Sequence, residues 1–203
     1  MKHFSEHLRD HHVASLFYLT PLANLESILA HGILCLHAAG GRRREDISND
    51  AVQRRREKWH GHVPLFFADN TPMLYEVCRS NLFAVLLEIS TAAANCDDVW
   101  FSDGNVASGE TKEYNDPVAL EKLDWSIIRS GEPAFGTDRH GRNWKRIRAA
   151  EVLIPGKCSA EHIQGVYYQP EPECIREKLQ KILDNSPHSR EIFLKPDLTP
   201  RGI

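Results

Sequence analysis

Apolar and polar positions follow two different periods along the chain, and each period predicts a different kind of element. Short apolar runs at residues 16–19, 63–67 and 82–89 predict strands, the last buried on both faces. Shorter strands are predicted at 151–154 and 166–168, and 192–194 is predicted as an edge strand.

Helices are predicted where apolar residues recur three and four positions apart. The first follows Thr20-Pro21, with Asn24 as its N-cap, Leu25, Ile28 and Leu29 on one face, and Gly32 as its left-handed stop. A short helix is predicted at 73–78 and longer ones at 118–128 and 173–183.

Two segments rich in glycine, arginine and charge lack either period. Residues 40–62 are either a loop or a solvated helix, and 130–148 is predicted as a connection. Because strands and helices are mixed without regular βαβ winding, the fold class is α+β. No break in composition divides the chain, so one domain over residues 1–203 is expected.

Charge is distributed unevenly, although the net charge is only −3. Residues 42–58 hold seven basic side chains against four acidic ones, and 139–148 hold five basic side chains and no acidic one. Such local basic patches bind phosphate on a protein that is not basic overall. Five cysteines without a CxxC pair favour reduced thiols in the cytoplasm, and no apolar run has the length of a membrane span.

Standard catalytic signatures are missing: the chain has no Walker loop, no dinucleotide-binding glycine motif, no HExxH and no nucleophile elbow. The histidine pairs His11-His12 and His60/His62 have no Cys or Asp at ligand spacing. No metal site is therefore predicted.

Glu151 begins an apolar strand directly after the second basic segment. As a strand-start residue it would be exposed and contribute little stability, so that Glu151→Ala would spare the fold. At the mouth of a cleft, the same carboxylate could bind a ribose hydroxyl and stabilise a cationic sugar-like transition state. Trp144, within the basic stretch, suits base stacking beside phosphate contacts, or is packed into the core.

Four blocks of sequence together resemble the DarT family of DNA ADP-ribosyltransferase toxins. They are FYLTPLANLESILAHGIL, AVQRRREKW, VPLFFADNTPMLYEV and RAAEVLI, at residues 17–34, 51–59, 63–77 and 148–154. The resemblance implies an ADP-ribosyltransferase fold, a split mixed sheet flanked by helices that holds NAD in a bent conformation. It also implies transfer of ADP-ribose to thymidine or guanosine in single-stranded DNA, by a monomeric toxin whose macrodomain antitoxin removes the mark.

The resemblance assigns roles to individual residues. Glu151 matches the catalytic glutamate and Arg56 the catalytic arginine, with Arg55 as the alternative if the register slips. Arg56 is expected to act electrostatically, because a guanidinium does not readily release its proton. NAD binding is expected from Tyr18, Leu19, Thr20, Ser27, Cys35 and Arg56, and DNA binding from Arg139, Arg142, Trp144, Lys145 and Arg146.

This chain departs from the family pattern in two ways. Many members have His where it has Tyr18 and Pro21, and the segment after Arg56 is short. Transfer to RNA or protein, and a nucleic-acid-binding module without catalysis, stay open as alternatives.

Overall fold

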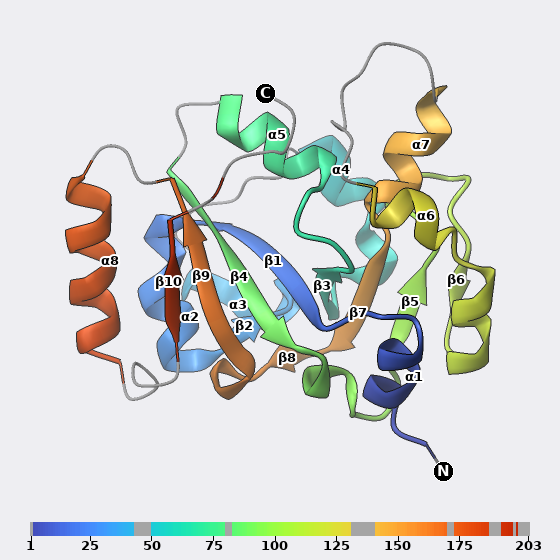
Figure 1. The fold of residues 1–203 in the computed structure, drawn as a ribbon, viewed down its shortest axis with the longest axis horizontal. Coiled ribbons are helices and arrows are strands. Elements are labelled where there is room, and N and C mark those ends of the chain that lie inside the picture. Colours follow the sequence, from blue (N-terminus) through green and yellow to red (C-terminus); the bar gives the residue numbers. More distant parts are fainter. Residues whose placement is uncertain are drawn as a thin grey trace.

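The computed structural model describes residues 2–42, 50–79, 83–130, 141–169, 173–186, 192–196 and 198. An eight-stranded sheet crosses the molecule, and its neighbouring strands run antiparallel except β9 and β10, which run parallel (Figure 1). In sheet order the strands are β10 (Phe193–Lys195), β9 (Ile163–Tyr168), β4 (Ala84–Ser90), β1 (Ser15–Pro21), β3 (His62–Phe66), β7 (Glu151–Pro155), β5 (Trp100–Ser102) and β6 (Glu113–Tyr114). A separate pair joins β2 (Ile33–Leu34) to β8 (Lys157–Cys158).

The sheet is split between β1 and β3. Strand β1 pairs with β4 along its whole length, from Ser15 opposite Ser90 to Pro21 opposite Ala84. With β3 it shares one register position, Phe17 opposite Phe66. No further register position joins β1 to β3 among the described residues.

Apolar side chains on both faces of the sheet hold the helices in place. On one face, α1 (Phe4–Asp10), α2 (Leu25–His31) and α8 (Cys174–Asp184) pack into the largest core cluster. On the other, Leu74 and Val77 of α5 (Pro72–Arg79) pack against Leu19, Phe66 and Leu86. Burying each such side chain stabilises the fold by roughly 1.5–3 kcal/mol.

Three helices gather at one end of the sheet. Figure 1 shows α4 (Asp50–Arg55), α5 and α7 (Gly141–Arg148) along its upper edge. Shorter helical turns connect the strands. They are α3 (Leu36–Ala39), α6 (Trp125–Ile128), and the 3₁₀ turns η1 (Leu22–Asn24), η2 (Gly40–Arg42), η3 (Glu57–Trp59), η4 (Thr91–Ala94), η5 (Pro117–Lys122) and η6 (Ala160–His162).

Most of the predicted elements are confirmed. Strands β1, β3, β4, β7, β9 and β10 and helices α2, α5 and α8 lie where the pattern places them. The α+β class is confirmed as well. Gly32 ends α2 with a φ of 83°, and a Cβ there would lie 2.6 Å from the Cys158 carbonyl oxygen. Glycine is therefore needed at this position for both conformation and space.

Three local predictions are wrong. The single helix at 118–128 is instead η5 followed by α6, because Leu123 is extended and the Asp124 carboxylate caps a new helix at the Ile127 N–H. Residues 141–148 form α7 rather than a connection. Asn24 does not cap α2: it belongs to η1, and its Nδ2 donates to Thr20 Oγ1 at 3.2 Å.

The segment 40–62 lies partly outside the described residues. In its described part, α4 has no buried residue, as expected of a solvated helix. None of the helices in the described ranges combines the length and apolar character needed to cross a membrane.

Candidate active site

Glu151 is fully buried, in contrast to the exposed strand end expected from the sequence. Strand β7 lies between β3 and β5, so its first residue is enclosed on both sides. Phe66 is its register partner in β3, and the Glu151 N–H donates to Ser102 Oγ at 3.2 Å. Burial raises the pKa of the Glu151 carboxyl to about 7, although the neighbouring Arg56 acts in the opposite direction.

The two carboxylate oxygens of Glu151 have different surroundings. Oε2 accepts a hydrogen bond from Arg56 Nη2 at 2.7 Å. Oε1 is buried and has no hydrogen-bond partner among the described residues. Because a buried acceptor without a partner is costly, Oε1 is the atom most ready to accept a donor from a ligand.

Arg56 follows the last turn of α4, and its backbone is well fixed. Its N–H donates to the carbonyls of Val52 and Gln53, at 3.2 and 3.0 Å. The Gln53 carbonyl also lies 2.9 Å from His60 Nε2. The guanidinium of Arg56 thereby reaches Glu151, whereas Arg55 lies on the exposed face of α4.

A large cleft opens beside Glu151, at the end of the sheet where α4, α5 and α7 gather. Its volume is about 1070 Å³, larger than most small-molecule pockets. Helix α4 contributes Arg55, α5 contributes Glu76, and α7 contributes Lys145. The loop between β5 and β6 forms a further wall from Asn105 to Thr111. A cleft of this size can hold a polymer segment as well as a nucleotide.

Two smaller pockets extend from this cleft along the split in the sheet. The nearer pocket shares Arg56 with the cleft and includes Trp59, His62 and Pro64. The farther pocket shares Tyr18 and Leu34 with the nearer one and runs along α2. Through these shared residues the two pockets form a path of neighbouring hollows from α2 to the cleft beside Glu151.

Most residues expected to bind NAD line this path. Thr20 and Ser27 face the α2 pocket, Cys35 faces the nearer pocket, and Tyr18 faces both. The side chain of Leu19 lies elsewhere, packed with Leu86 on the opposite face of the sheet. Side chains alternate along a strand, so Leu19 can contact a ligand in these pockets only through its backbone.

The structure adds three residues to this path that sequence reasoning did not assign. Arg42 lines the α2 pocket, and the ring of Trp59 meets that of His62 edge-on at 5.0 Å in the nearer pocket. Both His62 ring nitrogens are buried and have no partner among the described residues, and burial lowers the pKa of the ring. In the sequence, His62 stands out only by its spacing from His60, which suggests a metal site rather than a nucleotide pocket.

The basic segment before Glu151 is arranged differently from the expectation. Lys145 is exposed and lines the cleft. Trp144 is buried beside Arg148, whose guanidinium carbon lies 4.9 Å from its ring centre, so base stacking is excluded in this conformation. Arg146 Nη1 donates to Asp103 Oδ1 at 2.6 Å. Arg139 and the side chain of Arg142 lie outside the described residues.

Within the described ranges, no three His, Cys, Asp or Glu side chains gather as metal ligands would.

Comparisons with known proteins found related sequences and structures. The family model described as DarT, ssDNA thymidine ADP-ribosyltransferase, matches residues 17–199. A DNA ADP-ribosyl transferase–DNA ADP-ribosyl glycohydrolase fusion protein from Thermosipho africanus (strain H17ap60334) is 27% identical over 199 residues, 91% of this chain and 48% of that protein. The chain thus spans about half the length of this curated relative.

Solved structures share the fold. Thermus sp. 2.9 DarT in complex with ADP-ribosylated ssDNA matches with a TM-score of 0.76 and 20% identity, covering 92% of this chain and 96% of that one. Thermosipho africanus DarTG in complex with ADP-ribose matches with a TM-score of 0.75 and 23% identity, covering 91% of this chain and 50% of that one. The expected split-sheet ADP-ribosyltransferase fold is confirmed, and because the family model covers most of its length, the chain belongs to the DarT family.

Proposed function

We propose that this chain transfers ADP-ribose from NAD to thymidine in single-stranded DNA and releases nicotinamide. The observation that carries the proposal is the buried Glu151, which has one oxygen on Arg56 and the other without a described partner. It lies where the large cleft meets the path along the split sheet. Thermus sp. 2.9 DarT, which shares this fold, has been solved with NAD+ and with ADP-ribosylated ssDNA.

In this proposal the two halves of NAD occupy different pockets, whose volumes of about 30 and 60 Å³ increase as the dinucleotide binds. The adenosine end lies along α2, near Ser27, and the diphosphate lies near Arg42, whose fork can bond two oxygens. The nicotinamide end lies nearer Arg56, with Trp59 and the neutral His62 as an aromatic wall and a hydrogen-bonding group. The nicotinamide ribose then faces Glu151, and the dinucleotide is bent where the pockets meet.

The reaction breaks the bond between ribose C1′ and the nicotinamide nitrogen. The bonding electrons leave with nicotinamide, and the sugar develops oxocarbenium character. Glu151 accepts a hydrogen bond from a ribose hydroxyl through Oε1, and its negative charge stabilises the cationic sugar. A nitrogen of the acceptor base then bonds to C1′ and loses its proton to solvent.

Arg56 contributes positive charge to the site and does not act as a general base. Its guanidinium holds Glu151 in place at 2.7 Å and lies at the boundary between the path and the cleft. From this position it stabilises negative charge that develops on the base as its proton leaves. A guanidinium is protonated at all ordinary pH values, so this role needs no change in its ionisation.

The DNA strand is placed in the large cleft. Lys145 and Arg55 line it and can pair with phosphates, which supply much of the affinity for nucleic acid.

The Thermosipho africanus relative joins its transferase to a glycohydrolase, and a macrodomain glycohydrolase that reverses the modification is the proposed antitoxin partner. We infer a monomer acting in the cytoplasm, a reducing compartment that suits the exposed Cys96 and Cys174.

An acceptor panel tests the proposal. The chain is incubated with NAD and with oligonucleotides that each hold one kind of target base, a matched RNA, or a mixture of proteins, and products are identified by mass spectrometry. ADP-ribose on the thymidine oligonucleotide is expected. Labelling of the guanosine oligonucleotide would change the base, labelling of RNA or protein would change the substrate class, and DNA binding without NAD consumption would indicate a non-catalytic module.

A further inference from the structure

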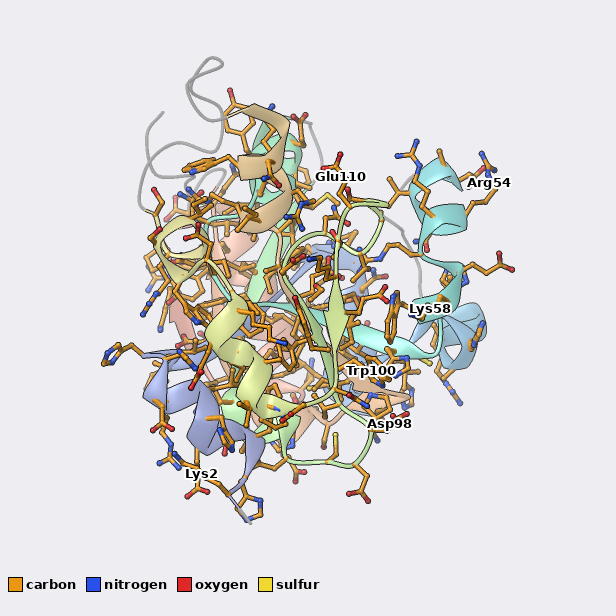
Figure 2. The ribbon with its side chains drawn as sticks, turned by 90° about the vertical axis from the view of Figure 1, so that its right-hand side faces the viewer. Lys2, Arg54, Lys58, Asp98, Trp100 and Glu110 are labelled. Atoms are coloured by element: carbon orange, nitrogen blue, oxygen red, sulfur yellow. The ribbon has the colours of Figure 1, made fainter. Side chains whose placement is uncertain are left out.

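The loop between β5 and β6 forms one wall of the cleft with its residues from Asn105 to Thr111. Figure 2 shows Glu110, on this loop, between the helix that carries Arg54 and α7. Three small residues, Ala107, Ser108 and Gly109, line the cleft. The N–H groups of Ala107, Ser108 and Thr111 donate within the loop, so its backbone carbonyls are the groups that can read the donor edge of a planar base.

This wall is attached directly to Glu151. Ser102, at the end of β5, is fully buried, and its Oγ donates to the Gly104 carbonyl at 2.6 Å. The same Oγ accepts from the Glu151 N–H at 3.2 Å. One hydroxyl therefore sets the distance between the start of the wall and the catalytic strand.

Arg146 of α7 fixes the wall from the other side. Its Nη1 donates to Asp103 Oδ1 at 2.6 Å, and its Nε donates to Asn143 Oδ1 at 3.0 Å. Its carbonyl accepts from the Asn105 N–H at 2.9 Å. The side chains of Arg146 and Asp103 are only 13% and 19% exposed, so the pair is partly shielded from solvent and salt.

Gly104 shows how closely the wall and α7 approach. A Cβ at this position would lie 2.6 Å from Arg146 Nη1 and 2.9 Å from the Arg146 carbonyl oxygen. The backbone oxygen cannot move out of the way as a side chain can. Glycine therefore permits the contact between the loop and the arginine.

Internal hydrogen bonds make the wall itself rigid. The Ser108 N–H donates to the Asn105 carbonyl at 2.9 Å, and Thr111 Oγ1 donates to the same carbonyl at 2.7 Å. The Ala107 N–H donates to Asn105 Oδ1 at 2.8 Å. A rigid loop that is clamped at its base moves as one body with its anchor.

We propose that Asp103 and Arg146 form a clamp that holds the 105–111 wall in register with Glu151, and that this wall reads the acceptor base. The inference rests on the proposed transfer to DNA and names the surface that selects the base. Arg146 is then a positioning residue, not a phosphate contact. Its guanidinium is already engaged by a carboxylate, a partner that would repel DNA phosphate.

Asp103→Asn separates the clamp from a phosphate-binding role. If Arg146 contacted phosphate, removing the negative charge beside it would leave DNA binding unchanged or strengthen it. The clamp predicts that Asp103→Asn weakens DNA binding, because the loop loses its anchor. Asp103→Asn and Arg146→Gln should each raise the KM for oligonucleotide about tenfold or more and reduce the preference among bases, while the Kd for NAD stays within about threefold.

Two further measurements complete the test. The log–log salt dependence of DNA binding should keep its slope in Arg146→Gln, whereas loss of a phosphate contact would reduce that slope by about one. The charge swap Asp103→Arg with Arg146→Asp should recover part of the lost KM and base preference, and Arg146→Lys should fall between wild type and Arg146→Gln. Lys178→Gln on α8 is the matched control.

The inference is overturned if Asp103→Asn binds DNA as well as or better than wild type, or if Arg146→Gln lowers the salt slope. If a single variant fails to fold, the KM and base preference of the charge swap and of Arg146→Lys still test the clamp. A wild-type chain that labels no DNA would instead refute the proposed function. Wild-type labelling together with variants of unchanged base preference would refute only the clamp.

Discussion

Arg56 Nη2 lies 2.7 Å from Glu151 Oε2, and this ion pair joins residues 95 positions apart inside the protein. The carboxylate is fully buried and the arginine side chain is 12% exposed. Removing one member of such a pair leaves the other charge uncompensated. Glu151→Ala is therefore not a neutral probe of catalysis, contrary to the expectation from sequence. Glu151→Gln is the better variant, because its amide keeps the volume of the side chain and an acceptor oxygen for Arg56.

The stability of Glu151→Gln relative to wild type should depend on pH. The folded-state pKa of Glu151, about 7, is above the ordinary glutamate pKa of 4.5, so folding favours the protonated carboxyl. Its contribution to stability is fully present below pH 4.5 and is lost as pH rises through about 7. Over this window the free energy of unfolding of wild type should fall relative to Glu151→Gln by on the order of 3 kcal/mol. Urea unfolding at pH 5 and pH 8 measures the difference, and equal differences at the two pH values would contradict the assignment.

Transfer activity should show the opposite dependence on pH. The ionised carboxylate stabilises the cationic sugar, and the ionised fraction rises as pH increases through about 7. The kcat/KM for NAD should therefore increase between pH 5.5 and 8 and then level off. Initial rates of nicotinamide release, measured with saturating oligonucleotide, follow this profile. A flat profile would mean that the group controlling the rate is not Glu151.

Arg56 and Arg55 should respond differently to the same conservative change. Lys replaces the planar fork with a single ammonium, so Arg56→Lys loses the aligned contact to Glu151 and should reduce kcat by about 10²-fold or more. Arg55 is on the exposed face of α4, and Arg55→Lys should stay within a few-fold of wild type. Full recovery of kcat by Arg56→Lys at high pH would instead support general-base chemistry at this position.

Lys145 is the described residue of the basic segment best placed to contact phosphate. It is exposed and lines the cleft, so Lys145→Gln should weaken DNA binding and lower the salt slope by about one. Fluorescence anisotropy of a labelled oligonucleotide at several salt concentrations measures both. An unchanged slope would place the DNA strand away from α7.

Much of the fold could be predicted because its central strands and three of its helices are strongly patterned. The apolar runs that became β1, β4 and β7 are long enough to be recognised as strands, and the apolar residues of α8 recur at helical spacing. By contrast, β5 and β6 have three and two residues, too few for any period. These two strands enclose Glu151 from one side, so its burial was not visible in the sequence.

Helix α7 illustrates a second limit on what the sequence can predict. The basic residues of α7 read as a connection, because its stability comes from tertiary contacts of Trp144, Arg146 and Arg148 rather than an apolar stripe. Arg56 and Glu151 were recognisable from family blocks, but the pairing of Arg146 with Asp103 joins segments that no local pattern connects. Charges in a sequence predict a basic patch, whereas only the fold shows which of them already have partners.

The most direct test of the account compares wild type with Glu151→Gln on an oligonucleotide that contains one thymidine. Nicotinamide release and the ADP-ribosylated product are quantified together, and NAD affinity is measured in parallel, with Glu121→Gln, an exposed residue of η5, as the control. The account predicts that Glu151→Gln keeps its fold and binds NAD within about threefold of wild type, yet loses transfer by about 10²- to 10³-fold. Thymidine labelling by Glu151→Gln within tenfold of the wild-type rate would contradict the central role of this carboxylate.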